Sequence, residues 1–136
     1  MTQEKWTVRP LIPGDVIRVY NGRFYHMGIY IGDEKVIHFA GPDTRHLTDS
    51  SQARVRISAI DDFAMKGQLE VRDYSLKERL RKRPGSRVIS EAKKHLGEGG
   101  YDIIHNNCEH FVNKCVFGVA YSLQIDQMRA VAEQGG

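Results

Sequence analysis

The sequence predicts an α+β fold in which an antiparallel β-sheet packs against helices. Two observations carry this prediction. β-rich runs separated by short turns fill residues 16–40, and an apolar repeat of helical spacing begins at Cys108. A chain of 136 residues suits one domain with its own core, so we expect a single domain over 1–136. Its core is expected at 10–118, followed by a C-terminal helix at 119–133.

The sheet is predicted from two turns. Asn21-Gly22 is the strongest hairpin signal in the chain, and it separates the β-rich runs 16–20 and 24–31. Residues 32–34 then turn the chain back into a third run, 35–40. These three runs form an antiparallel meander, which we expect to nucleate the sheet.

Further elements follow from composition and periodicity. Residues 1–10 are polar and are expected to be an extended lead-in. Residues 54–60 alternate polar and apolar side chains, which is typical of a half-buried strand, and the acidic residues after them are expected to end it. Residues 69–74 form another predicted strand. Ser86 is the expected cap of a helix running to Leu96, because apolar side chains recur on one side of it.

The composition is ordinary for a soluble globular protein, with 40% hydrophobic and 27% charged residues. A net charge of +3 does not demand nucleic acid, and no such partner is expected. No apolar run approaches the roughly 18–20 residues that span a bilayer, so no transmembrane anchor is expected. The N-terminus has no secretory signal, and two cysteines are too few for a disulfide framework. Free thiols and a cytoplasmic location follow as expectations.

Cys108 is predicted to lie in the first turn of a buried helix. One helical face carries apolar residues at the spacing i, i+3, i+4, i+7 and i+8, namely Cys108, Phe111, Val112, Cys115 and Val116. Asn106 or Asn107 is a suitable N-cap, and Gly118 a suitable end. Free N–H groups at a helix start favour a thiolate, the nucleophile of acyl transfer. The alternative is that Cys108 is a core residue, which is how we interpret Cys115.

A cysteine nucleophile needs a base, and His26 and His38 are the candidates. Each interrupts an apolar strand, where a buried imidazole must find a polar partner. His110 follows Cys108 by two residues, so it points away from the cysteine on a helix and is interpreted as structural.

The loop between the two strands decides whether His26 and His38 share a face of the sheet. A three-residue loop makes His38 face Gly28 and places the two histidines on one face as diagonal neighbours. A two-residue loop at 33–34 puts them on opposite faces unless a bulge intervenes. The alternative to a pair is two unrelated core histidines.

Metal binding is a second class of function. His105, Cys108, His110 and Cys115 are four soft ligands close together in sequence. Zinc needs its ligands to converge, whereas Cys108 and Cys115 on one helix lie about 10 Å apart. We therefore expect neither a metal nor a cofactor. A third class is a catalytically silent binding module that uses the same pocket.

The stretch from Lys77 to Arg87 is strongly basic. It sets six cations against the carboxylate of Glu78, and they are Lys77, Arg79, Arg81, Lys82, Arg83 and Arg87. One interpretation is a solvated loop or short helix. The other is a patch for phosphate-bearing ligands or for an anionic membrane.

Three blocks of this sequence resemble the lecithin:retinol acyltransferase family, which includes the HRAS-like suppressor phospholipase/acyltransferases. They are the histidine-containing runs 26–32 and 36–40 and the Asn-Cys-Glu-His-Phe-Val block at 107–112. The resemblance covers roughly residues 10–118. It implies the permuted NlpC-like, papain-like variety of α+β fold, with the sheet packed against the cysteine helix.

The resemblance also implies the chemistry. By position, Cys108 matches the family nucleophile, His26 the general base and His38 the orienting third residue. The Cys108 backbone N–H would be one oxyanion-hole donor. The implied activity is a cysteine-dependent phospholipase A/acyltransferase on phospholipid acyl esters, by hydrolysis or transfer. The charge of the stretch from Lys77 to Arg87, and not the resemblance, adds the expectation of peripheral contact at anionic membranes. A cysteine peptidase or amidase on peptide-like substrates is the alternative.

Overall fold

The computed structural model describes residues 4–41, 50–102 and 107–119. The predicted C-terminal helix, His105 and Asn106 lie outside these ranges. The strands are β1 (Lys5–Thr7), β2 (Val16–Tyr20), β3 (Tyr25–Gly32), β4 (Lys35–Ala40), β5 (Arg54–Ala59) and β6 (Glu70–Asp73). The helices are α1 (Ile60–Ala64), α2 (Leu76–Arg79), α3 (Gly85–Lys94) and α4 (Cys108–Phe117), with a 3₁₀ turn at Ser50–Gln52.

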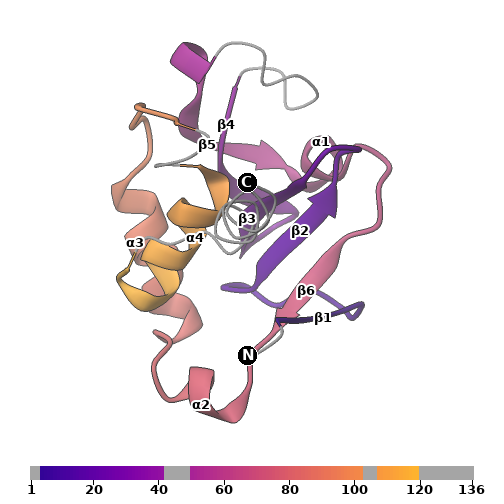
Figure 1. The fold of residues 1–136 in the computed structure, drawn as a ribbon, viewed down its shortest axis with the longest axis vertical. Helices are drawn as coiled ribbons and strands as arrows, with labels where there is room; N and C mark the ends of the chain where they lie inside the picture. The colour runs from indigo at the N-terminus through magenta and orange to yellow at the C-terminus, as the bar shows by residue number, and fades with distance from the viewer. Residues whose placement is uncertain (1–3, 42–49, 103–106, 120–136) are drawn as a thin grey trace, which may run out of the picture.

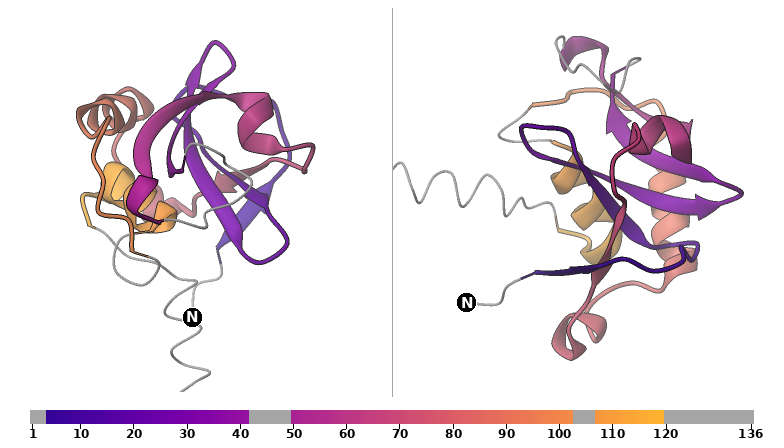
Figure 2. Two further views of the ribbon diagram at one scale, coloured as in Figure 1. Left: turned by 90° about the horizontal axis from the view of Figure 1, so that it is seen from above. Right: turned by 90° about the vertical axis from the view of Figure 1, so that its right-hand side faces the viewer.

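The strands form one six-stranded antiparallel sheet in the order β1-β6-β2-β3-β4-β5. Helices α3 and α4 cover one face, and α1 lies on the other (Figures 1 and 2). Met27, Ile29 and Phe39 belong to the larger core cluster together with residues of α3 and α4. The smaller cluster surrounds Phe63 of α1 on the opposite face. The predicted α+β fold, with the sheet packed against the cysteine helix, is confirmed.

The β3–β4 hairpin combines two features that the sequence offered as alternatives. Its loop has two residues, Asp33 and Glu34, both with positive φ. A bulge between Tyr30 and Gly32 adds one residue to β3, and Gly28 faces His38. The three-residue loop is therefore wrong, yet the predicted pairing is right, because the bulge restores the parity that a two-residue loop would have reversed.

Two local predictions are corrected, and a third is confirmed. The lead-in contains strand β1, which pairs with β6 at the sheet edge. Strand β5 ends at Ala59, before the acidic residues, as predicted, and these residues then occupy the first turn of α1, where the helix dipole favours carboxylates. Helix α3 begins before Ser86, because the carbonyl of Pro84 accepts from the backbone N–H groups of Arg87 and Val88 and makes Pro84 the N-cap.

Helix α4 follows the prediction at both ends. The Asn107 side chain accepts from the backbone N–H groups of Glu109 and His110 at 2.9 and 3.0 Å. His110 Nδ1 accepts in return from the Asn107 N–H at 3.0 Å, which completes a capping box and gives this histidine its structural role. Gly118 ends the helix with a φ of 80°, a left-handed conformation that favours glycine.

Candidate active site

Cys108 is the first residue of α4, and its side chain is buried against the sheet. Its thiol interacts with the backbone N–H of Met27 on β3. Because Met27 directly follows His26, this contact brings the sulfur beside the strand segment that carries the predicted base. In this structure the Cys108 thiol contacts the backbone amide of Met27 and does not contact the His26 ring.

The Met27 amide is available because β3 and β4 part at this point. Tyr30 exchanges backbone hydrogen bonds with Gly14 and Asp15, which lead into β2. By the alternation of an antiparallel ladder, the Met27 N–H therefore points toward β4. The β3–β4 ladder begins only at the Gly28–His38 pair, whereas β4 continues alongside β5 as far as Ala40. Cys108 therefore occupies the opening between the two diverging strands.

The two histidines form a hydrogen-bonded chain that ends on a serine. His26 Nε2 lies 2.8 Å from His38 Nδ1, and His38 Nε2 lies 2.8 Å from Ser58 Oγ. Ser58 on β5 was missed in the sequence, where it read as the polar side of a half-buried strand. Its pairing with Val36 places it on the face of His38, but that register joins strands distant in the chain.

The chain of rings constrains where protons reside. A neutral His26 can accept a thiol proton at Nδ1 only if its own proton is on Nε2. His38 Nδ1 must then be the acceptor, so the His38 proton is on Nε2 and is donated to Ser58 Oγ. With the serine hydroxyl as acceptor, His26 Nδ1 carries no proton and can act as a base. With the hydroxyl as donor, the chain reverses and His26 Nδ1 carries the proton.

Burial keeps the site uncharged. It lowers the pKa of His26 to about 4, and burial together with the charges of His26 and Arg56 lowers the pKa of His38 to about 2. Burial also raises the pKa of the Cys108 thiol to about 12, outweighing the backbone N–H groups that stabilise a thiolate. The expectation of a lowered pKa is therefore wrong for this structure, and the resting pair is a neutral thiol and a neutral imidazole.

Phe63 of α1 packs against both imidazole rings. Its ring centroid lies 5.1 Å from that of His26 and 5.4 Å from that of His38. Gly28 makes room for it, because a Cβ at this position would lie 2.9 Å from Phe63 Cε2 and 2.6 Å from Val36 Cγ1. The missing side chain at Gly28 thus allows the aromatic support of the histidine pair.

The other ligand-type residues do not join this site. His95 pairs with Glu98 at 2.7 Å on the surface. Within the described ranges, no three His, Cys, Asp or Glu side chains group as metal ligands. In the same ranges, no helix is long and apolar enough to cross a bilayer.

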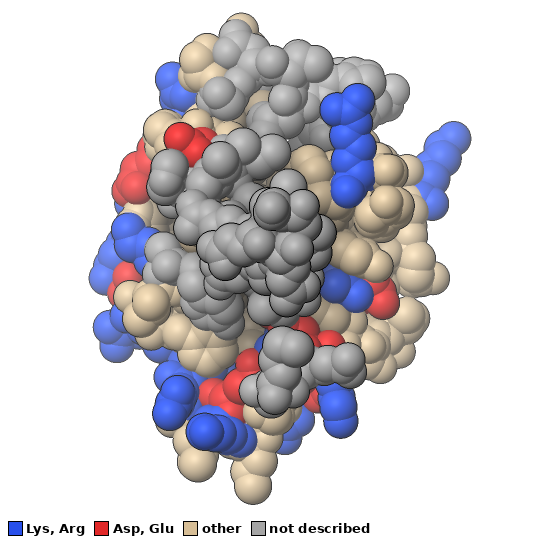
Figure 3. All heavy atoms as spheres, in the orientation of Figure 1, with Lys and Arg blue, Asp and Glu red and all other residues tan. Residues whose placement is uncertain are grey.

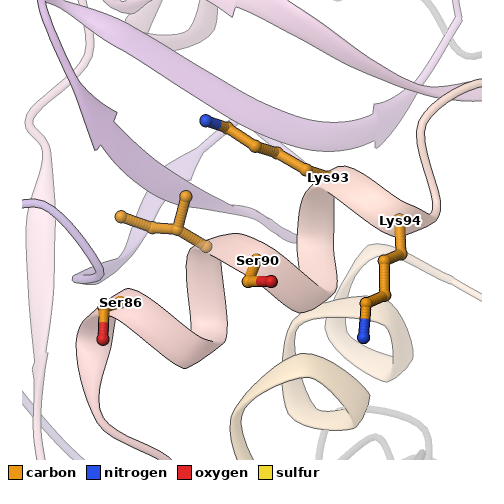
Figure 4. Close-up of a pocket in the computed structure, with 5 residues that line it drawn as sticks. Ser86, Ser90, Lys93 and Lys94 are labelled. Carbon is orange, nitrogen blue, oxygen red and sulfur yellow. The ribbon is translucent and has the colours of Figure 1, made fainter.

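A recess lies elsewhere, along α3 (Figure 4). It has a volume of about 470 Å³, and its described lining is Ser86, Ile89, Ser90, Lys93 and Lys94. These five residues come from one helix and include none of the residues around Cys108. The recess therefore has no part in the candidate chemistry.

The chain is similar in sequence to known proteins. The chain matches the family model described as lecithin retinol acyltransferase over residues 10–121. It is 30% identical to the lecithin retinol acyltransferase of Bos taurus over 143 residues, covering 90% of this chain and 61% of that protein. It is 31% identical to phospholipase A and acyltransferase 3 of Homo sapiens over 135 residues, covering 91% and 82%. The chain thus spans about three fifths of the length of the first of these relatives.

Proposed function

Because the chain belongs to the lecithin retinol acyltransferase family, we propose that it is a thiol-dependent acyl hydrolase or acyltransferase acting on phospholipid acyl esters. The observation that carries the proposal is the position of the Cys108 thiol on the amide next to His26, at the start of a helix. The thiol thus lies at a helix N-terminus and one residue along the strand from the proposed base, and acyl transfer requires a nucleophile, a base and an oxyanion donor of this kind.

The proposed reaction begins with the neutral pair. The Cys108 sulfur attacks the ester carbonyl while His26 Nδ1 takes the thiol proton, so that the C–S bond forms as the S–H bond breaks. The tetrahedral oxyanion accepts a hydrogen bond from the Cys108 backbone N–H. Collapse releases the lysophospholipid alcohol, which takes the proton back from His26, and leaves an acyl thioester on Cys108.

In the second half of the reaction, His26 again acts as the base, and a new nucleophile attacks the acyl thioester. His26 removes a proton from water or from an acceptor hydroxyl or amine, which attacks the thioester carbonyl. The Cys108 thiol leaves with that proton. Water gives hydrolysis, and another acceptor gives transfer. His38 stabilises the transient charge on His26, and Ser58 orients His38 through the 2.8 Å hydrogen bond.

We also propose a cytoplasmic protein in peripheral contact with anionic membrane through residues of the Lys77 to Arg87 stretch. Its support is charge and exposure, since Lys77, Arg79, Arg81 and Arg87 are exposed. Both cysteines are free thiols, which suits a reducing compartment.

The proposal is tested by intact-mass spectrometry after incubation with a short-chain phosphatidylcholine. The expected result is an added acyl mass that is absent in Cys108→Ala and removed by hydroxylamine. A peptide amide carrying the same acyl group serves as the matched substrate. Acylation by the amide alone would favour the peptidase alternative, and a folded protein acylated by neither substrate would indicate a silent binding module.

A further inference from the structure

Two leucines stand out on the surface of this protein. Leu76 at the start of α2 is 78% exposed, and Leu80 just after α2 is 82% exposed. They are spaced i, i+4, so they lie on the same side of the helical turn. Figure 1 and the right-hand view of Figure 2 show α2 projecting from one end of the molecule.

The turn that presents them is held by specific interactions. Ser75 and Glu78 form a capping box, with hydrogen bonds of 3.2 and 3.0 Å. Glu78 also pairs with the buried guanidinium of Arg72. The leucines therefore project from an ordered helical turn, and their exposure is built into its conformation.

Cations surround the two leucines. Lys77, Arg79 and Arg81 are exposed, and Lys77 and Arg81 make no ion pair among the residues that the structure describes. The nearby carboxylates are already engaged, Glu78 by Arg72 and Asp73 by Arg79 at 3.7 Å. In Figure 3, blue side chains lie near the end of the molecule where Figure 1 places α2, with red side chains among them.

The remaining cations of the stretch make other contacts and take no part in this surface. Arg87 is exposed on α3 and pairs with Glu91 at 3.3 Å. Arg83 donates to the carbonyls of Lys114 and Cys115 at 3.3 and 3.2 Å, at the C-terminal end of α4. Lys82 donates to the Arg83 carbonyl and lies over the ring of Tyr74. The basic stretch thus divides into Arg83, which binds the C-terminal end of α4, two cations with other contacts, and an outer group around the leucines.

We propose that this tip, Leu76 to Arg81, docks onto an anionic lipid surface by inserting Leu76 and Leu80 among the acyl chains. The proposal deepens the proposed function and rests on it for the biological setting. An apolar pair ringed by cations matches such a surface, because leucines enter its apolar boundary while lysine and arginine remain among anionic headgroups. A solvated basic loop would not need two ordered, exposed leucines.

The tip lies far from the nucleophile along α4. The backbone N–H of Arg83 donates to the Val116 carbonyl at 2.8 Å, which ties the segment after α2 to the C-terminal end of that helix. Cys108 is at the opposite end of its ten residues, about 13 Å away at 1.5 Å per residue. Substitutions at the tip should therefore leave the chemistry on a dispersed substrate unchanged.

The test is co-sedimentation with vesicles of phosphatidylcholine and phosphatidylserine in equal parts. Leu76→Ser with Leu80→Ser should weaken binding about tenfold or more at every salt concentration, because buried acyl contacts are lost. Lys77→Gln with Arg81→Gln should weaken it strongly at low salt and little at high salt, because headgroup attraction is screened. Leu96→Ser, at a leucine 39% exposed on the α3 side, is the matched control and should bind as the parent does.

Two further measurements keep the proposal separate from the proposed function. Cys108→Ala should bind vesicles like the parent, whatever the outcome of the acylation experiment. Both double variants should turn over a monomeric short-chain ester at the parental rate. Parental vesicle binding by the double leucine variant would overturn the proposal, as would a parent protein that self-associates through these leucines and ignores vesicles.

Discussion

Cys108 and Cys115 lie at opposite ends of one buried helical face and are alike by the usual measures. Their exposed fractions are 2% and 1%, and burial raises the pKa of each thiol to about 12. The two thiols differ in their surroundings at the two ends of α4. Cys108 meets the Met27 N–H beside the histidine chain, whereas the carbonyl of Cys115 accepts from Arg83. Burial therefore does not distinguish the two thiols, whereas the backbone donors around each of them do.

The largest expected effect separates the two thiols directly. Cys108→Ala should lower ester turnover about a thousandfold or more, because it removes the covalent step. Cys115→Ala should keep kcat and lose about 1 kcal/mol of unfolding free energy through poorer packing. Steady-state kinetics and denaturant unfolding of both variants measure this difference. A large loss of kcat in Cys115→Ala with native-like stability would contradict it.

Among the described residues the histidine chain has no counterpart near Cys115, and it should make stability depend on pH. His26 and His38 have folded pKa values of about 4 and 2, below the ordinary value of 6.5, so the unfolded chain binds protons first on acidification. Stability is then complete above pH 6.5 and falls as the pH is lowered toward 4. Each histidine contributes about 1.4 kcal/mol per pH unit within this window.

Denaturant unfolding between pH 7 and pH 5 measures this slope, before most carboxylates titrate. His38→Asn provides the comparison, since it removes one of the two groups. A parent protein whose unfolding free energy does not change across this range would show that the rings are not buried in the neutral form.

The two ends of helix α4 can be compared by substituting the residues that cap them. Asn107→Ala removes the acceptor of two N–H groups next to Cys108, and should cost about 1–2 kcal/mol of unfolding free energy. Asn107→Ser keeps a capping oxygen and should recover most of this loss. Arg83→Ala at the other end should cost about 1 kcal/mol, whereas Arg81→Ala on the exposed tip should be neutral within error.

The smallest expected effect concerns Ser58. Ser58→Ala removes one hydrogen bond to His38 and should lower kcat by up to about tenfold, with KM little changed. Ser58→Thr keeps a hydroxyl and should restore the rate, and Ser90→Ala on exposed α3 is the control. If Ser58 has only a structural role, Ser58→Ala should change stability but not the pH dependence of kcat. If Ser58 sets the proton positions on the two histidines, Ser58→Ala should shift the acidic limb of the kcat–pH profile.

The parts of the site that could be predicted were those specified by neighbours in sequence. Asn107 and Gly118 define α4 through their own local chemistry, so both were readable from the chain. The Gly28–His38 pairing was predicted as well, although the bulge that produces it was only an alternative. The resemblance of the three sequence blocks supplied the roles that spacing alone left open.

What could not be predicted depends on contacts between distant segments. Ser58 reaches His38 only because β5 pairs with β4 in one register, and nothing within β5 signals it. Arg83 looks like any member of the basic stretch until α4 supplies the carbonyls that it binds. The thiol pKa was mispredicted for the same reason, since desolvation comes from the packing of the sheet against α4.

The most direct test of Cys108 as the nucleophile is to locate the acyl group during turnover. The protein is mixed with a short-chain phosphatidylcholine, quenched in acid during the first turnover and digested for peptide mass mapping. The expected result is a hydroxylamine-sensitive acyl mass on the peptide containing Cys108, and none on Cys115 when the two are separated by fragmentation. An acyl mass on Cys115, or full turnover in Cys108→Ala, would contradict it.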